Sequence, residues 1–595
     1  MVVITPGVDF IARSVASVGL FFGIVVNVHS VVASRLGYHA PTWAIVAGAI
    51  FSIPTLATLN IMGRKLYNMY QASRMGAQIV PEAQGKWPGN LDILLEMMKN
   101  FKTGYPGDGL VELLEKRGPV VNMRVMWSDT IFTASPEHIK TMLATDFENY
   151  VKGKRFIFNM ESVLGTGVFN SDGEMWKFHR SITRPMFTRE RISHFELFDR
   201  RSSQVVDKLR ERLRQGYAVD FQDLMSRFTL DAATEFLFGS SVDSLTAGLP
   251  YPENATNVPT IQRTAKGDAA NEFATAFLEA QNVISVRERF GWVWPLAEIA
   301  KDKSYQPMQV VNAYIDPIVK DALARKRSIP VEERGLKNGE HDTLVDNLVS
   351  VTDDPVVLKD EILNIMIAGK DTTASTLTFI FYFLSIYPEV MNRLRTEILD
   401  KVGPSRRPDY DDIREMRYLR AVINETLRLY PIVPFNIRES VKASTWKSSD
   451  PTQKPYFIPA GVKTAYSVFM MHRRKDLWGP DAEEFDPDRF LDERLKKYLS
   501  KNPFIFLPFN AGPRICLGQQ FAYNEMSFII VRLLQNFSSV ELDPDSAPAD
   551  AHPPKEWAQA SGRKSIEKLF PKMHLTMYTN GGLWVKMTES DNINK

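Results

Sequence analysis

The chain has 595 residues, a formal net charge of +2 and 44% hydrophobic residues, a balance typical of a globular protein. The nearly neutral charge gives no reason to expect a nucleic-acid partner. With one cysteine, Cys516, the chain cannot form an intrachain disulfide or a structural zinc site that needs two or more cysteines. The thiol is therefore either an inert core side chain, which is the usual case, or a ligand.

Two uncharged stretches near the N-terminus, Ser14–Ser34 and Thr42–Met62, predict a membrane anchor. Each is long enough to cross a bilayer, which takes about 20 apolar residues in a helix. Either both insert as a helical hairpin, or Thr42–Met62 spans the membrane alone. Arg64 and Lys65 follow the second stretch, and the positive-inside bias then leaves the rest of the chain in the cytoplasm. We expect residues 1–75 to form this anchor, with one or two transmembrane helices.

Residues 76–106 are expected to form a linker that leads into the main domain, because Pro and Gly recur between Ile79 and Asn90. Helical periodicity then dominates, and helices are expected at Glu174–Phe187, Ile192–Arg214, Leu224–Phe238, Ala270–Phe290, Gln306–Arg327, Val356–Ile386, Glu389–Val402 and Tyr418–Leu429. Short strands are expected at Val120–Arg124, Thr130–Ala134 and Gly582–Met587, and long loops at Ser240–Arg263 and Asp543–Arg563. The pattern predicts one mainly α domain with a minor β-sheet region over residues 107–595.

The neighbours of Cys516 favour a ligand over a core side chain. They read Phe509-Asn510-Ala511-Gly512-Pro513-Arg514-Ile515-Cys516-Leu517-Gly518. Iron in a porphyrin can take a thiolate as its axial ligand, and the thiolate favours O–O cleavage. Gly512 and Gly518 would let the backbone pass close beneath a flat ring, and Arg514 could reach a haem propionate. Phe509 could shield the sulfur from water. The run predicts a haem b whose iron is bound by Cys516.

This run resembles the haem-binding loop of the cytochrome P450 family, and the family's other motifs follow in the expected order. The resemblance covers roughly Gly107 to Thr588. It implies a P450 fold of the microsomal type, preceded by the transmembrane anchor, and a haem-thiolate monooxygenase domain on the cytoplasmic side of the endoplasmic reticulum membrane. The strings Glu425–Pro431 and Ala368–Thr373 look most like those of fungal alkane and fatty-acid hydroxylases, a branch whose basidiomycete members also oxidise aromatic hydrocarbons.

Glu425 and Arg428 resemble the family's ExxR pair. On an ordinary helix such a pair is a solvated surface contact worth about 0.2–0.5 kcal/mol. The resemblance implies instead that the two side chains join Arg489, from Pro487–Phe490, in a buried structural network. It also implies that Trp176 and Arg180, in a WxxxR match, and Arg438 bind the haem propionates. His179 could assist them or lie on the surface.

The string Ala368–Thr373 looks like the family's oxygen-activating motif and lies in the middle of the expected helix Val356–Ile386. Gly369 and the two threonines are unfavourable inside a helix, so a local kink or widened turn is expected there. Thr372 is expected to hold a water and hydrogen-bond the bound oxygen, while Asp371 relays protons from solvent. A kink without catalytic meaning is the alternative.

The resemblance also indicates the substrate pocket and the partners. The pocket would be lined by Phe156, Phe158, Val163, Asn364, Ile367, Ala368, Ile432, Val433, Phe435 and Thr579. Most of these are apolar, so the expected substrate is a hydrophobic small molecule, such as a long-chain fatty acid, an alkane or an aromatic hydrocarbon. O2 is the co-substrate. Electrons would come from NADPH through a separate, membrane-bound NADPH–cytochrome P450 reductase, with cytochrome b5 as a further candidate partner.

The reductase would dock where Lys177, Arg184 and Arg514 supply positive charge. Two other interpretations of the whole chain stay open. One is a member of the same fold that rearranges or dehydrates its substrate without O2. Such members usually lose the acid–alcohol pair, which is present here as Asp371 and Thr372. The other is a non-enzymatic haem-binding membrane protein.

Overall fold

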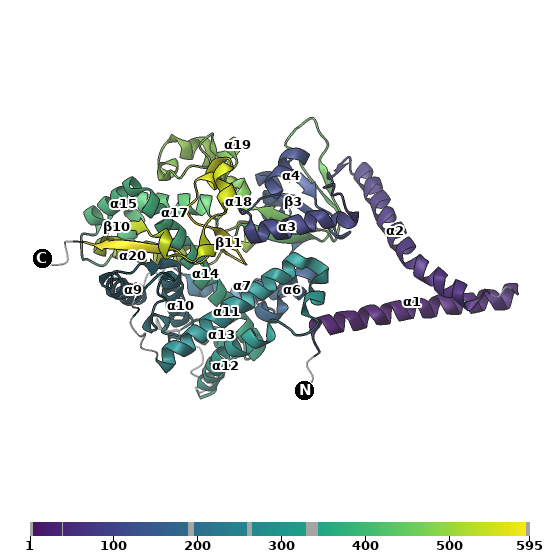
Figure 1. Ribbon diagram of the computed structural model, residues 1–595, viewed down its shortest axis with the longest axis horizontal. Coiled ribbons are helices and arrows are strands. Elements are labelled where there is room, and N and C mark those ends of the chain that lie inside the picture. Colours follow the sequence, from purple (N-terminus) through teal and green to yellow (C-terminus); the bar gives the residue numbers. More distant parts are fainter. Residues whose placement is uncertain are drawn as a thin grey trace.

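The computed structural model describes residues 4–590, apart from 38–39, 189–194, 257, 259–263 and 329–342. A mainly helical domain with small sheets carries two long N-terminal helices that project from it (Figure 1). Three expected features fall partly outside the described residues. They are the turn between the two spans, the first residues of the helix Ile192–Arg214 and the end of the loop Ser240–Arg263.

The two projecting helices are α1 (Pro6–Leu36) and α2 (Thr42–Arg74), and both are long and apolar enough to cross a membrane. They meet at the end of the hairpin that lies farthest from the domain (Figure 1). Large apolar side chains such as Leu20 and Ile50 are exposed along them. An exposed apolar surface of this kind is stable against lipid rather than water.

Both ends of the hairpin are attached to the domain. At the start of α1, Thr5 Oγ1 donates a hydrogen bond to the Ile299 carbonyl oxygen at 2.7 Å, and the rings of Phe10 and Trp292 lie 6.3 Å apart. After α2 the chain forms β1 (Gln78–Ile79), which pairs in parallel with β8 (Tyr456–Ile458). The hairpin is therefore anchored at two separate places on the domain surface.

The central element is α14 (Pro355–Ile386), which packs against α10 (Phe221–Phe238), α17 (Arg417–Leu429) and β10 (Phe537–Leu542). Most of its side chains between Leu358 and Leu384 are buried. A helix that is covered on all sides needs apolar residues over most of its surface, and the polar side chains that α14 buries, such as Glu361, Asn364 and Asp371, have polar partners.

The remaining helices surround α14. Those expected from periodicity form within a few residues of their expected limits, as α7 (Gly173–Thr183), α9 (Glu196–Arg214), α11 (Ala265–Phe290), α12 (Tyr305–Ser328) and α15 (Pro388–Lys401). The expected helix Glu174–Phe187 ends early, and a 3₁₀ turn at Arg184–Phe187 follows it, where Pro185 lacks an N–H donor.

Several helices had no clear signal in the sequence. They are α3 (Leu91–Thr103), α4 (Leu110–Arg117), α5 (Pro136–Lys140), α6 (Lys154–Leu164), α13 (Leu344–Val351), α16 (Tyr410–Glu415), α18 (Val468–Met471) and α19 (Lys475–Trp478). A further helix, α20 (Gln519–Asn536), follows the Cys516 loop. Of these, α3 lies in the segment expected to be a linker. The expected loop after Asp543 consists of short 3₁₀ turns.

The largest sheet has five strands in the order β2 (Val120–Asn122), β3 (Thr130–Thr133), β9 (Lys463–Ser467), β6 (Phe435–Ser440) and β4 (Tyr150–Val151). Its pairs are antiparallel except β3 with β9. The smaller sheets are β1–β8–β7 (Ser444–Trp446), β10–β13 (Trp584–Glu589)–β5 (Val219–Asp220) and the hairpin of β11 (Pro571–Met573) and β12 (Met577–Thr579).

The contact between α1 and the turn Gly291–Glu298 depends on Gly7. A Cβ at this position would lie 2.6 Å from both the Ile299 Cα and the Pro295 carbonyl oxygen. We expect Gly7→Val to detach α1, and limited proteolysis of the full-length protein in membranes should then cut residues 291–298 several-fold faster. Gly19→Val is the control on the same helix, because a Cβ there meets no atom within 4 Å. Equal cleavage in both variants would contradict this packing.

Candidate active site

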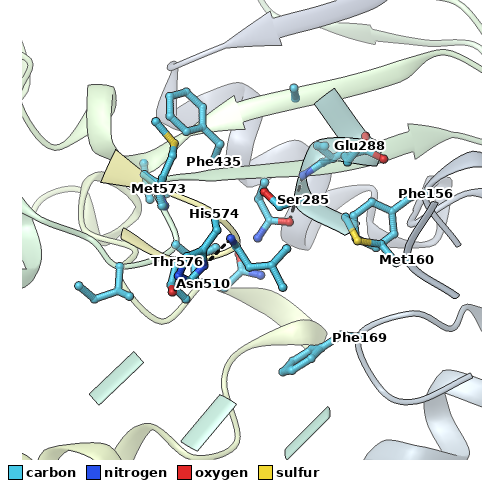
Figure 2. A pocket seen from close by; sticks show the side chains of 18 of the residues that line it. Phe156, Met160, Phe169, Ser285, Glu288, Phe435, Asn510, Met573, His574 and Thr576 are labelled. Atoms are coloured by element: carbon cyan, nitrogen blue, oxygen red, sulfur yellow. Dashed lines mark hydrogen bonds between the residues drawn. The ribbon is translucent and has the colours of Figure 1, made fainter. Parts of the chain in front are cut away.

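A cavity of about 970 Å³ lies between α14, the Cys516 loop and the five-stranded sheet. Its wall is mostly apolar. Side chains from separate elements converge on it in Figure 2, among them Phe156 and Met160 of α6, Phe435 of β6, and Met573 and His574 at the β11–β12 turn. The volume falls at the upper end of what small-molecule and cofactor sites require.

Cys516 stands just before α20, and its side chain lines the cavity. Its backbone N–H donates to the Phe509 carbonyl oxygen at 3.0 Å, which closes the loop around the cysteine. Burial raises the pKa of the Cys516 thiol, while a hydrogen bond from the Gly518 N–H and the charge of Arg180 oppose this rise. These two groups are the ones that would stabilise a thiolate at this position.

Gly512 is required for a reason other than the expected close approach of a ring. Its φ is +66°, and a Cβ there would overlap the Leu143 carbonyl oxygen. The glycine therefore fixes the loop against the turn Thr141–Thr145. At Gly518 a Cβ would meet the Phe187 ring at 3.4 Å, an ordinary contact. Phe509 packs on Tyr523 of α20, with ring centroids 5.2 Å apart.

Three enclosed cations, Lys152, Arg438 and Arg514, gather on one wall of this cavity. Burial and the charges of Arg438 and Arg514 lower the pKa of Lys152, and burial and the charge of Arg438 lower that of Arg514 to about 10. Asp172 is one nearby acid, with Oδ1 2.8 Å from Arg514 Nη2. The Nε atoms of Arg438 and Arg514 are buried without a hydrogen-bond partner among the described residues.

Uncompensated buried charges and donors of this kind are costly unless an anion joins them. The two carboxylates of a haem would supply that anion next to Cys516, so the residues present fit the cofactor. Trp176 lies 4.5 Å from the Arg514 guanidinium, and Arg180 Nη1 donates to the Ile515 carbonyl oxygen at 3.0 Å. Lys152 was not anticipated, because a lone lysine after a short strand carries no signal of burial.

His179 is not on the surface and does not join this cluster. It is fully buried, with Nδ1 2.7 Å from Glu361 Oε2 on α14. Its place on the inner face of α7 follows from the helical period, since it lies three residues after Trp176.

The structure brings Glu425, Arg428 and Arg489 together in the interior. Glu425 receives two hydrogen bonds from Arg428, at 2.7 and 2.8 Å, and its Oε1 lies 3.5 Å from Arg489 Nε. All three side chains have an exposure of 1% or less. The pair that would be a weak surface contact on an isolated helix is thus a buried network.

This network is linked to the cysteine loop through His472. Arg428 Nη1 donates to the His472 carbonyl oxygen at 2.9 Å, and His472 Nε2 accepts a hydrogen bond from the Leu507 N–H at 2.9 Å. Burial and the charge of Arg428 lower the pKa of His472 to about 3. The imidazole is therefore neutral at physiological pH and keeps the lone pair that accepts from Leu507.

The helix α14 runs through the Ala368–Thr373 motif without the expected kink. Thr372 Oγ1 donates to the Ala368 carbonyl oxygen at 2.6 Å. The hydroxyl hydrogen therefore has its acceptor within the helix, while the side chain still lines the cavity. Asp371 lies outside the cavity wall and pairs with Lys370 at 2.7 Å. Burial raises the pKa of Asp371, but the charge of Lys370, with smaller contributions from His574 and Gln281, brings it below its usual value.

Six of the ten expected pocket residues line the cavity: Phe156, Ile367, Ala368, Ile432, Val433 and Phe435. Four do not. On α6 the cavity face carries Phe156, Met160 and Leu164, spaced by four residues, so Phe158 and Val163 point elsewhere. Phe158 is 56% exposed and packs on Trp294, whereas Val163 is buried in the helical core.

The other two expected pocket residues are held by polar contacts away from the cavity. Asn364 Nδ2 donates to the Leu164 carbonyl oxygen at 2.8 Å, and its Oδ1 accepts from the Phe169 N–H at 3.0 Å. Thr579 is bound through its backbone to Gln222. The turn that precedes β12, from Met573 to Thr576, lines the cavity instead.

A cysteine loop, a cluster of three cations and a threonine of the central helix surround one apolar cavity, and together they fit a thiolate-bound haem with its two carboxylates. A family model described as cytochrome P450 matches residues 88–566. The chain is 36% identical over 428 residues to cytochrome P450 52-M1 of Starmerella bombicola, covering 70% of this chain and 76% of that protein.

It is also 37% identical over 467 residues to cytochrome P450 52E1 of Candida apicola, covering 76% and 85% of the two chains. It is 34% identical over 499 residues to cytochrome P450 monooxygenase himC of Aspergillus japonicus, covering 84% and 81%. The chain therefore belongs to the cytochrome P450 family, as predicted, and is an oxidoreductase. The expected mainly α fold with a minor sheet is confirmed.

Removal of Glu425 would leave the buried guanidinium of Arg428 without its carboxylate, at a cost of about 3–5 kcal/mol, whereas Arg489 would keep the carboxylate of Asp481 at 2.9 Å. We expect Glu425→Ala to lose most of its bound haem, measured as the haem-to-protein ratio of the purified protein. Asp411→Ala is the control, because Asp411 and Arg414 form an i,i+3 pair at 3.2 Å that is exposed on both sides. Normal haem content in Glu425→Ala would contradict the structural role of the network.

Proposed function

We propose that this protein is a membrane-anchored haem-thiolate monooxygenase that inserts one atom of O2 into a hydrophobic substrate. Long-chain fatty acids, alkanes and aromatic hydrocarbons are the substrate classes that its motifs favour. The observation that carries the proposal is a single apolar cavity lined by Cys516, by Thr372 of α14 and by cations without sufficient anionic partners. One of its relatives, himC of Aspergillus japonicus, is a cytochrome P450 monooxygenase.

In this proposal Cys516 holds the haem iron, and Lys152, Arg438 and Arg514 bind the propionates, with Trp176 and Arg180 beside them. The haem, when bound, supplies the activation of O2 that no amino-acid side chain provides. The loop from Phe509 to Gly518 keeps water away from the sulfur and donates a backbone hydrogen bond to it.

Thr372 is placed to hold the proton-donating water. Its hydrogen is engaged by the Ala368 carbonyl, so its oxygen is left to accept a hydrogen bond from a water in the cavity. Asp371 is the preceding residue, is ionised at neutral pH and is paired with Lys370 on the side of α14 away from the cavity. We infer that protons reach Thr372 from solvent by way of this ion pair.

We further propose that α1 and α2 insert as a hairpin in the endoplasmic reticulum membrane. Because both ends of the hairpin contact the domain, the N-terminus and the domain then lie on the same, cytoplasmic face. NADPH–cytochrome P450 reductase is the proposed electron donor, with cytochrome b5 as a second candidate. Lys177 and Arg184 are exposed and available for its docking, whereas Arg514 is enclosed in the cation cluster and is not.

The reduced, CO-bound protein is expected to show the red-shifted Soret band of thiolate ligation, and Cys516→Ala is expected to lack it. With reductase, NADPH and a long-chain acid or alkane, the wild type should form hydroxylated product and the variant none, as measured by mass spectrometry. The same red-shifted band in Cys516→Ala would refute the assignment of Cys516 as the iron ligand. A wild type with the band but without product from any of these substrates would refute the proposed activity.

Thr372→Ala is expected to keep consuming NADPH while product falls by about tenfold or more, with release of hydrogen peroxide in its place. Thr378→Ala is the matched control, since Thr378 Oγ1 also donates to the carbonyl four residues earlier, at 2.8 Å, but is fully buried away from the cavity. The measurement is the amount of hydroxylated product formed per NADPH consumed, in the wild type and in both variants. Equal ratios in Thr372→Ala and in the wild type would rule out the proton-delivery role.

A further inference from the structure

Arg289 is the penultimate residue of α11 and lines the same cavity as Cys516. Its Nη2 donates to the carbonyl oxygens of Met573 and His574, each at 3.0 Å. The guanidinium lies 3.4 Å from the centroid of the Phe101 ring on α3. Three separate elements thus fix the orientation of this one side chain.

Arg289 has no carboxylate partner among the described residues. Among the cavity's other cations, Lys463 pairs with Glu288, and Lys152, Arg438 and Arg514 form the cluster assigned to the propionates. Arg155 also lacks a carboxylate partner among the described residues, but it donates to Ser128 Oγ at 2.8 Å. Arg180 donates to the Ile515 carbonyl oxygen, and Lys102 is exposed.

The charged form of Arg289 is unfavourable in these surroundings without a carboxylate partner. Burial lowers its pKa to about 9, and Tyr578 is the group that opposes the shift. The two carbonyl oxygens engage Nη2, and the ring of Phe101 covers a face of the guanidinium. Nη1 and Nε remain for a ligand, and each can donate a charge-assisted hydrogen bond to a carboxylate oxygen.

We propose that Arg289 binds the carboxylate of the substrate, so that the cavity selects a long-chain carboxylic acid over the corresponding ester or alkane. This inference rests on the proposed function and names the substrate class of that site. The apolar wall, with Met97, Phe156 and Phe435, would take the alkyl chain. A carboxyl group fixed at Arg289 keeps the adjacent carbon away from Cys516, so oxidation falls farther along the chain.

The test compares dodecanoic acid, its methyl ester and dodecane as probes of the full-length haem protein in nanodiscs. Each is titrated by the spin-state change of the haem, which gives a Kd. The wild type should bind the acid at least about tenfold more tightly than the ester, because hydrogen bonds to a charged partner contribute about 1.5–3 kcal/mol. Arg289→Gln should weaken acid binding by about 10- to 100-fold and leave ester binding within about twofold.

Arg155→Gln is the matched control, because it removes from the same cavity a guanidinium that is already bound to Ser128. Its ratio of acid to ester affinity should equal that of the wild type. Arg289→Lys keeps the charge without the planar pair of donors, and an intermediate ratio is expected. If Arg289→Gln does not incorporate haem, the ratios of the wild type and of Arg289→Lys decide.

Three results would overturn the inference: equal affinities for acid and ester in the wild type, an unchanged ratio in the Arg289 variants, or a ratio that falls only in Arg155→Gln. Each of them leaves the proposed function intact if the wild type still hydroxylates a probe. A wild type that lacks the thiolate CO band or any hydroxylated product would instead count against the proposed function. The two failures are therefore read from different measurements.

Discussion

The structure depends on the buried contact of Glu425 with Arg428 and Arg489. A carboxylate and two guanidinium groups in the interior are tolerable only when their remaining donors are used. Here Arg428 also binds the carbonyl oxygens of His472, Ala482 and Glu484, and Arg489 binds those of Trp478 and Asp481. The ion pair on α17 therefore holds the irregular backbone between His472 and Glu484, which does not belong to a β-sheet.

That segment in turn positions the cysteine loop. His472 accepts the Leu507 N–H, the chain continues to Phe509, and the Phe509 carbonyl receives the N–H of Cys516. On its other side the loop is held by Gly512 against the Leu143 carbonyl. The sulfur is thus placed by backbone contacts on both sides, which is the rigidity that an axial ligand needs.

Charge is distributed unevenly around the cavity. Lys152, Arg438 and Arg514 are cations whose mutual repulsion a dianion would relieve, whereas Arg289 lies among α3, α11 and the β11–β12 turn, where Lys102 of α3 also lines the cavity. Between them the wall is apolar. Such an arrangement fits a cofactor with two carboxylates in one region and an elongated substrate with one polar end in another.

The attachment of the hairpin adds a constraint on the approach to this cavity. The turn Gly291–Glu298 directly follows Arg289 and Phe290 in the chain, and it is the part of the domain that the start of α1 covers. The membrane helices therefore contact the same segment that completes one wall of the cavity. A hydrophobic substrate that partitions into lipid would meet the protein close to this segment.

Helix positions, the haem loop and the family motifs could be read from the chain because they depend on local pattern. Periodicity gave α7, α9, α10, α11, α12, α14, α15 and α17 within a few residues, and a rare residue, Cys516, was surrounded by residues whose types match one chemistry. The same local reasoning identified Glu425 and Arg428 as a pair, since they are three residues apart on one helix.

Tertiary packing alone decided which of several possible faces meets the cavity. The side chain of Phe156 points into the cavity, whereas those of Phe158, Val163, Asn364 and Thr579 point elsewhere. The neighbours that set these directions are distant in sequence, as Leu164 is from Asn364. Lys152, His179 and Arg289 look like surface residues in the chain, because nothing local reveals that a charge will be buried. The sequence by itself thus determined the family and identified Cys516 as the proposed iron ligand, and the fold decided which charges and side chains surround it.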